Sequence, residues 1–152
     1  MVSVETRSTS FEVLLVEDSP GDVRLTRESF KDAKVHINLH VASDGVEAMA
    51  VLRHEGKYKD VPRPDLILLD LNLPKKSGRE VLEEIKADSD LMSIPVVVLT
   101  TSASDEDVLR SYLLHANCFI TKPVDLAGFL KVVQSIDNFW LSIVKLPRGP
   151  TS

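Results

Sequence analysis

Residues 66–74, LILLDLNLP, are the stretch that decides the fold of this chain. Four apolar residues lead directly into Asp70, and Pro74 ends the segment. A run this short and this apolar is typical of a strand that is buried on both faces of a sheet. In open α/β sheets, ligands bind at the carboxyl ends of the strands. We therefore predict that Asp70 carries the chemistry of this protein.

Strand-like and helix-like segments alternate five times along the chain, which indicates a parallel sheet with right-handed crossovers. Residues 37–41 alternate apolar and polar side chains, as a half-exposed edge strand does, whereas the first, third and fourth runs are continuously apolar and so belong inside the sheet. We therefore expect an α/β, flavodoxin-like doubly wound fold with strand order 2-1-3-4-5 and helices on both faces. The predicted strands are residues 11–16, 37–41, 65–69, 95–99 and 117–121.

Residues suited to the N-cap position precede each predicted helix. Ser19 stands before Pro20, and the helix that follows is expected to reach about Ala33. The second helix is expected to run from Asp44 to about His54, with Gly56 as its stop. The later helices are predicted to begin at a capping box over residues 77–80, at Ser104 and near Asp125.

Composition narrows the class of protein. The chain has 152 residues, 43% of them hydrophobic and 27% charged, with a formal net charge of -5. These values are ordinary for one soluble domain and argue against a nucleic-acid-binding surface. A single cysteine, Cys118, and the lack of an apolar run of membrane-spanning length favour a cytoplasmic protein with no membrane partner. We expect a flexible N-terminus over 1–10, one domain over 11–146 and a tail over 147–152.

Acidic side chains end two strands that the predicted order makes neighbours. Glu17 and Asp18 follow the first strand, and Asp70 follows the third. Three converging carboxylates repel one another, and a bound divalent cation removes that repulsion. Oxygen ligands with water suit Mg²⁺, so we predict a magnesium site in which Asn72 contributes its backbone carbonyl.

Two further side chains are expected at the same edge. Thr100 and Lys122 follow the fourth and fifth predicted strands. A hydroxyl, an ammonium group and Mg²⁺ together can neutralise three phosphoryl oxygens, and phosphoryl transfer requires mainly positioning and charge neutralisation. Because carboxylates can act as nucleophiles that form aspartyl phosphates, we predict that Asp70 is a covalent phosphate acceptor.

Five motifs in order make the chain resemble a response-regulator receiver domain of two-component signalling, over roughly residues 11–138. They are VEDS at 16–19, LLDLNLP at 68–74, Gly78, VVLTTS at 97–102 and CFITKP at 118–123. The resemblance implies that a histidine kinase donates the phosphoryl group to Asp70, and that Thr100 and Phe119 reorient afterwards. It also implies a cis bond between Lys122 and Pro123.

A narrower likeness concerns residues 17–28, EDSPGDVRLTRE, and 136–147, IDNFWLSIVKLP. Both resemble the small response regulators that are paired with cyanobacterial phytochromes, which implies a phytochrome as the kinase. The second stretch is dense in apolar residues, and exposing several of them is unfavourable. These residues could close the core of this domain or be buried against another subunit. We favour the second, with an extended last helix and a homodimer through the helix after Ser104, the strand at 117–121 and the helix from Asp125.

Other functions remain as alternatives. With no second domain, we expect a stand-alone regulator that acts by changing its association with other proteins and is not an enzyme beyond slow self-dephosphorylation. An aspartate-nucleophile phosphatase is one alternative, but such enzymes need a second acid two residues after the nucleophile, where this chain has Asn72. The other is a pseudo-receiver that binds partners without being phosphorylated, and the complete set of site residues argues against it.

Overall fold

The computed structural model describes residues 10–33, 36–101 and 118–134. These residues contain a five-stranded sheet of order β2-β1-β3-β4-β5, in which every neighbouring pair is parallel. The predicted strand order is therefore confirmed, with the half-exposed strand at one edge. The strands are β1 (Ser10–Val16), β2 (His36–Ala42), β3 (Leu66–Asp70), β4 (Val96–Thr100) and β5 (Cys118–Thr121).

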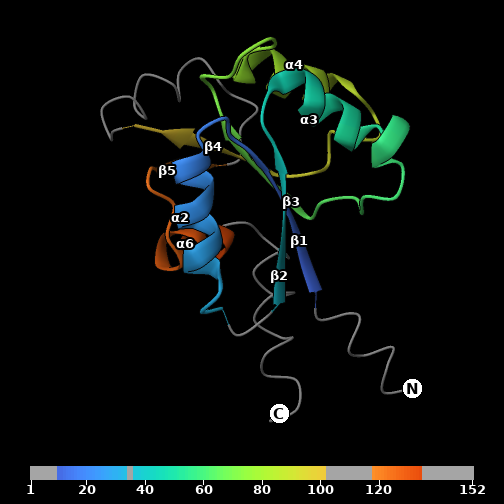
Figure 1. Cartoon of the computed structure of the whole chain (residues 1–152). Helices are drawn as coiled ribbons and strands as arrows, with labels where there is room; N and C mark the ends of the chain where they lie inside the picture. The colour runs from blue at the N-terminus through green and yellow to red at the C-terminus, as the bar shows by residue number, and fades with distance from the viewer. Residues whose placement is uncertain (1–9, 34–35, 102–117, 135–152) are drawn as a thin grey trace, which may run out of the picture.

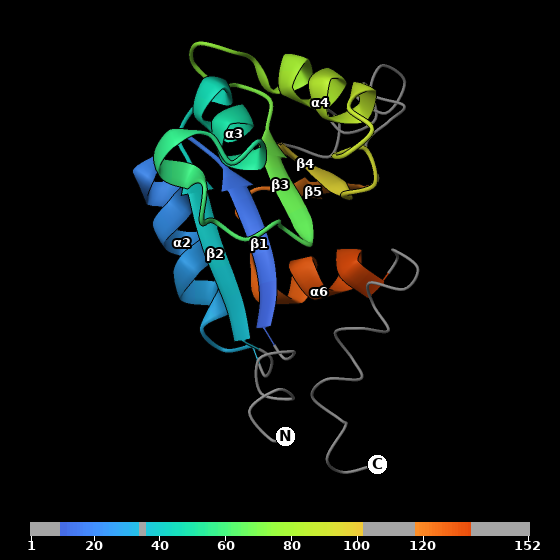
Figure 2. The same ribbon diagram turned by 90° about the vertical axis from the view of Figure 1, so that its right-hand side faces the viewer.

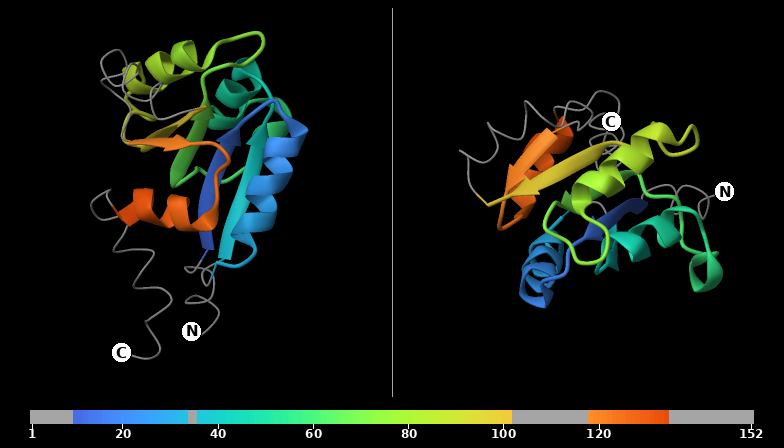
Figure 3. Two further views of the ribbon diagram at one scale, coloured as in Figure 1. Left: turned by 90° about the vertical axis from the view of Figure 1, so that its left-hand side faces the viewer. Right: turned by 90° about the horizontal axis from the view of Figure 1, so that it is seen from above.

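Helices cover both faces of this sheet, as predicted. Figures 1 and 2 show α2 and α6 on one side, and α3 and α4 on the other. The same arrangement is visible from the opposite side and from above in Figure 3. None of the helices in the described ranges is long and apolar enough to span a membrane. The helices are α2 (Pro20–Phe30), α3 (Gly45–Leu52), α4 (Gly78–Ala87) and α6 (Leu126–Gln134), with a short 3-10 helix, η1 (Gly56–Tyr58).

The core has two layers because successive side chains of β1 and β3 point to opposite faces. Phe129 of α6 is fully buried in one layer, where its ring lies 4.6 Å from that of Phe30 and 6.3 Å from that of Phe11. All five residues of β3 are buried, as the uniform apolar run predicts. One layer contains Val13, Leu15, Leu66 and Leu68, and the other contains Leu14, Val16, Ile67 and Leu69.

Several element ends differ from the sequence-based expectation. Helix α2 ends at Phe30, because the next three residues make tighter backbone bonds of the i to i−3 type. Helix α3 ends at Leu52, and His54 adopts a left-handed φ of 55° that a helix cannot continue. Strands β3 and β4 each begin and end one residue later than predicted, so they include Asp70 and Thr100.

Part of the predicted chain lies outside the described residues. This part includes residues 1–9, the helix expected after Ser104 and the extension of the last helix past Gln134. The tail predicted over 147–152 also lies there. The predictions for these segments therefore remain predictions.

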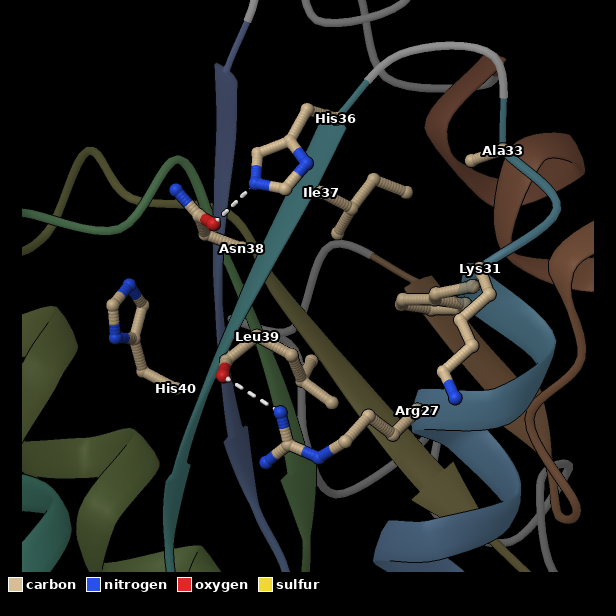
Figure 4. A pocket seen from close by; sticks show the side chains of 9 residues that line it. Arg27, Lys31, Ala33, His36, Ile37, Asn38, Leu39 and His40 are labelled. Carbon is tan, nitrogen blue, oxygen red and sulfur yellow. Dashed lines mark hydrogen bonds between the residues drawn. The ribbon is translucent and has the colours of Figure 1, made fainter.

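A groove of about 510 Å³ follows the outer edge of β2 (Figure 4). Its lining comes from β2, from α2 and from the turn after α2. Arg27 of α2 reaches across it and donates from Nη1 to the carbonyl oxygen of Leu39 at 3.5 Å. An unpaired strand edge invites association with another strand, and Arg27 covers one of its acceptors. None of the residues at the carboxyl ends of the strands lines this groove.

Gly78, the first residue of α4, packs directly against the end of β3. Its N–H donates to the carbonyl oxygen of Leu71 at 3.1 Å, and Ser77 and Glu80 form the predicted capping box around it. A Cβ atom at this position would lie 2.5 Å from the Cα atom of Leu71 and would also collide with the carbonyl oxygen of Asp70. Both neighbours are backbone, so they cannot move aside easily. This glycine therefore fixes the backbone that carries Asp70.

We expect Gly78→Ala to lower the free energy of unfolding by roughly 1–3 kcal/mol, the usual cost of overpacking. Gly21→Ala is the matched control, because a Cβ there would meet only the Ser19 Oγ atom at 3.9 Å. That change should be neutral or should stabilise the protein by up to about 1 kcal/mol, since alanine favours the helix. Urea unfolding of the two variants checks this. Equal stabilities would contradict the packing argument.

Candidate functional site

The carboxyl ends of β1 and β3 bring three carboxylates together. Glu17 and Asp18 directly follow β1, and the Glu17 N–H donates to the carbonyl oxygen of Ala42 at 3.0 Å, which fixes the turn. One carboxylate oxygen from each of Glu17, Asp18 and Asp70 lies within 4.8 Å of the others. Glu17 and Asp70 are buried, whereas Asp18 is exposed. The convergence that the sequence predicts is therefore present.

Lys122 joins this cluster from the end of β5. Its backbone N–H donates to the carbonyl oxygen of Thr100 at 2.8 Å, and its bond to Pro123 is cis, as the resemblance implied. Its Nζ atom donates to Asp70 Oδ2 at 3.0 Å and to Glu17 Oε1 at 3.0 Å. The lysine side chain is only 19% exposed, so its ammonium group is partly desolvated.

Of the remaining predicted site residues, Asn72 contacts Asp70, whereas Thr100 and Phe119 contact other groups. Thr100 ends β4 and is buried, and its hydroxyl donates to the carbonyl oxygen of Ile120 at 3.4 Å. Asn72 donates its backbone N–H to Asp70 Oδ1 at 3.0 Å, so it orients the aspartate through its main chain. Phe119 of β5 is buried in the core layer under α3 and α4.

Asp22 is a site residue that the sequence analysis did not identify. It lies in the first turn of α2, where its N–H donates to the N-cap oxygen of Ser19 at 3.3 Å. Its Oδ2 atom accepts a hydrogen bond from Lys122 Nζ at 3.2 Å. The sequence indicates that the first turn of α2 lies beside this edge of the sheet, because α2 begins directly after the acidic pair, but it does not indicate which side chain of that turn reaches Lys122.

The electrostatics of the cluster are unbalanced. Burial raises the pKa of Glu17 and the charge of Asp70 raises it further, while the hydrogen bond from Lys122 lowers it, with a net value of about 7. Burial lowers the pKa of Lys122, but its hydrogen bonds to Glu17 and Asp70 more than offset this, and the net pKa is raised. One ammonium group therefore faces several carboxylates.

This excess of negative charge fits a divalent cation. Carboxylate oxygens are the ligands that hard cations prefer, and Glu17, Asp18 and Asp70 each offer one to a common point. The residues present are therefore suited to hold such an ion.

The raised pKa of Glu17 predicts how stability depends on pH in the metal-free protein. Folded Glu17 holds its proton up to about pH 7, against an ordinary value of 4.5. Its contribution to the free energy of unfolding is therefore complete below about pH 4.5 and declines as the pH rises to about 7. Glu17→Gln should remove this decline, which is at most about 3 kcal/mol.

Urea unfolding at pH 5 and pH 8 with EDTA measures this effect. We expect the stability of Glu17→Gln relative to the parent protein to increase between the two pH values. Parallel pH profiles would show that Glu17 does not titrate in this range. Glu28→Gln, on the exposed face of α2, should follow the parent profile.

Comparison with known proteins identifies the family. The model of the response regulator receiver domain matches residues 13–134. Response regulator Rcp1 of Synechocystis sp. is 55% identical over 137 residues, which cover 90% of this chain and 93% of Rcp1. A crystal structure of Rcp1 in its Mn²⁺-bound form has a TM-score of 0.68 at 54% identity and covers 86% of this chain and 94% of that chain.

Two further solved structures are similar over most of their length. The bacteriophytochrome response regulator AtBRR has a TM-score of 0.79 at 41% identity, covering 86% of this chain and 94% of its own. The phosphorylated cyanobacterial phytochrome response regulator RcpA has a TM-score of 0.70 at 52% identity, covering 88% and 95%. With a family model across most of the sequence, and a matching sheet order and acidic edge, this chain belongs to the response regulator receiver domain family.

Proposed function

We propose that this protein receives a phosphoryl group on Asp70 from a histidine kinase and signals by changing its association with other proteins. The observation that carries the proposal is the contact of Asp70 Oδ2 with Lys122 Nζ at 3.0 Å inside a cluster of carboxylates. An ammonium group held at the acceptor oxygen stabilises the negative charge that arrives with phosphorus.

The proposed transfer needs no reactant other than the phosphodonor. An oxygen of the Asp70 carboxylate attacks phosphorus, the bond from phosphorus to the donor nitrogen or oxygen breaks, and the donor leaves with that electron pair. Asn72 holds the other carboxylate oxygen through its N–H, so the attacking carboxylate is oriented before the donor arrives. Lys122 supplies a positive charge to the phosphoryl oxygens, and Thr100 supplies a hydroxyl at the same edge.

Mg²⁺ is the metal that we propose for this site. Glu17, Asp18 and Asp70 would hold it, with the backbone carbonyl of Asn72 as a further ligand. When bound, it supplies positive charge to the phosphoryl group and offsets the repulsion between the carboxylates. The Mn²⁺-bound form of the relative Rcp1 supports a divalent ion in this family.

A phytochrome is the kinase that we propose as the donor. The support is the likeness to Rcp1 and to the structures of phytochrome response regulators. We also propose that the protein works in the cytoplasm, because its single cysteine, Cys118, cannot form an intrachain disulfide. We propose that Thr100 and Phe119 transmit the change, since both are buried in neighbouring strands. Asn72 offers an amide where a phosphatase needs an acid, so the protein is a phosphate acceptor with slow self-dephosphorylation rather than an enzyme that turns over substrate.

We expect acetyl phosphate and Mg²⁺ to add the mass of one phosphoryl group to the protein. Asp70→Asn should abolish this gain, because an amide is a poor nucleophile. Asp60→Asn is the matched control, since Asp60 is an exposed loop carboxylate, and it should behave as the parent protein. Intact mass spectrometry checks all three. An unchanged mass of the parent protein, or an equal gain in Asp70→Asn, would contradict the proposal.

A homodimer through the last strand and the last helix is also proposed, on the basis of the sequence. Of this surface the structure describes Cys118–Thr121 and Leu126–Gln134. Trp140 lies in the apolar extension beyond them. We expect Trp140→Ala to weaken dimerisation at least tenfold, as the loss of a large buried side chain does. Analytical ultracentrifugation measures it, and the same monomer in both proteins would refute the dimer.

A further inference from the structure

Lys122 has all of its hydrogen-bond donors engaged by carboxylates. An ammonium group carries three N–H donors. The Nζ atom lies 3.0 Å from Asp70 Oδ2, 3.0 Å from Glu17 Oε1 and 3.2 Å from Asp22 Oδ2. No donor is left for an incoming phosphoryl oxygen unless one of these carboxylates releases the ammonium group.

The three carboxylates differ in how easily they can release the ammonium group of Lys122. The side chain of Asp22 is 38% exposed, whereas that of Glu17 is 2% exposed and that of Asp70 is 6% exposed. Water can replace Lys122 more readily at the partly exposed Asp22 than at the two buried carboxylates, because ion pairs become weaker as their groups become more exposed. Releasing Lys122 from Glu17 or from Asp70 would cost more, because both carboxylates are buried and water cannot easily replace the lost hydrogen bond.

The position of Asp22 is fixed by local hydrogen bonds that do not use its carboxylate. Its N–H donates to Ser19 Oγ at 3.3 Å, and its carbonyl oxygen accepts from Thr26 Oγ1 at 3.0 Å. These contacts hold the backbone of the first turn of α2. The side chain can therefore be changed without removing the cap of the helix.

We propose that Asp22 is a positioning residue for Lys122. While Asp70 is unphosphorylated, Asp22 accepts a hydrogen bond from Lys122, and after phosphorylation Lys122 donates that hydrogen bond to a phosphoryl oxygen instead. The inference rests on the proposed function. In this scheme Asp22 stabilises the unphosphorylated site through its bond to Lys122. It disfavours the phosphorylated site through repulsion of the added negative charge. Asp22 therefore sets how far phosphorylation proceeds.

The test compares the rates of gain and loss of the phosphoryl group in Asp22→Asn and in the parent protein. Acetyl phosphate is the donor, Mg²⁺ is raised until the rates no longer change, and intact mass gives the phosphorylated fraction over time. We expect the ratio of the gain rate constant to the loss rate constant to rise about twofold to fivefold, the size expected from one partly exposed charge pair.

Two matched variants separate this effect from a general effect of removing a negative charge from α2. Glu28→Gln removes the same charge from the same helix, where Glu28 pairs with Lys31 at 3.0 Å, and should leave the ratio unchanged. Asp22→Glu restores a carboxylate within reach of Lys122 and should return the ratio toward the parent value. A variant that is merely damaged would lose phosphorylation rather than gain it.

Each outcome is decisive. A raised ratio in Asp22→Asn alone supports the role of Asp22. A ratio equal to or below that of the parent, or an equal rise in Glu28→Gln, overturns it. If the parent protein itself gains no phosphoryl group, the proposed function fails instead, so the two failures are distinguishable.

Discussion

The contact of Lys122 with Asp70 and Glu17 is the interaction on which the site depends. It joins residues that are 52 and 105 positions apart in the sequence. Two buried carboxylates at one edge are unfavourable, because burial and mutual repulsion both oppose their charge. The ammonium group offsets part of that cost, and the raised pKa of Glu17 shows that a part remains. This remaining imbalance makes the site receptive to a divalent cation.

The sheet holds the charged and polar groups of the site in a fixed arrangement. Neighbouring parallel strands end at a common edge, so Glu17, Asp70, Thr100 and Lys122 reach one region from four strand ends. The two core layers hold those ends rigidly, since every residue of β3 and β4 is buried. Gly78 adds close packing of α4 behind Asp70. Rigid placement matters because phosphoryl transfer depends on positioning and electrostatics more than on covalent chemistry by the protein.

Much of this could be predicted from local patterns. The uniform apolar run before Asp70 indicated a central strand, and the alternation at Ile37, Leu39 and Val41 indicated an edge strand. These patterns gave the strand order that the structure has. Helix ends were predicted less well, since the tight bonds after Phe30 and the left-handed His54 leave no distinct signal in the sequence.

The sequence by itself determined the fold class, the strand order and the convergence of Glu17, Asp18, Asp70 and Lys122, because hydrophobic periodicity and the rule for parallel strands are sufficient for these. Only the tertiary structure decided how the groups share hydrogen bonds. It placed Asp22 on Lys122 and directed the Thr100 hydroxyl to the backbone of β5. These hydrogen bonds depend on how a helix packs on the sheet and on how deeply each atom is buried. The spacing of residues along the chain specifies neither.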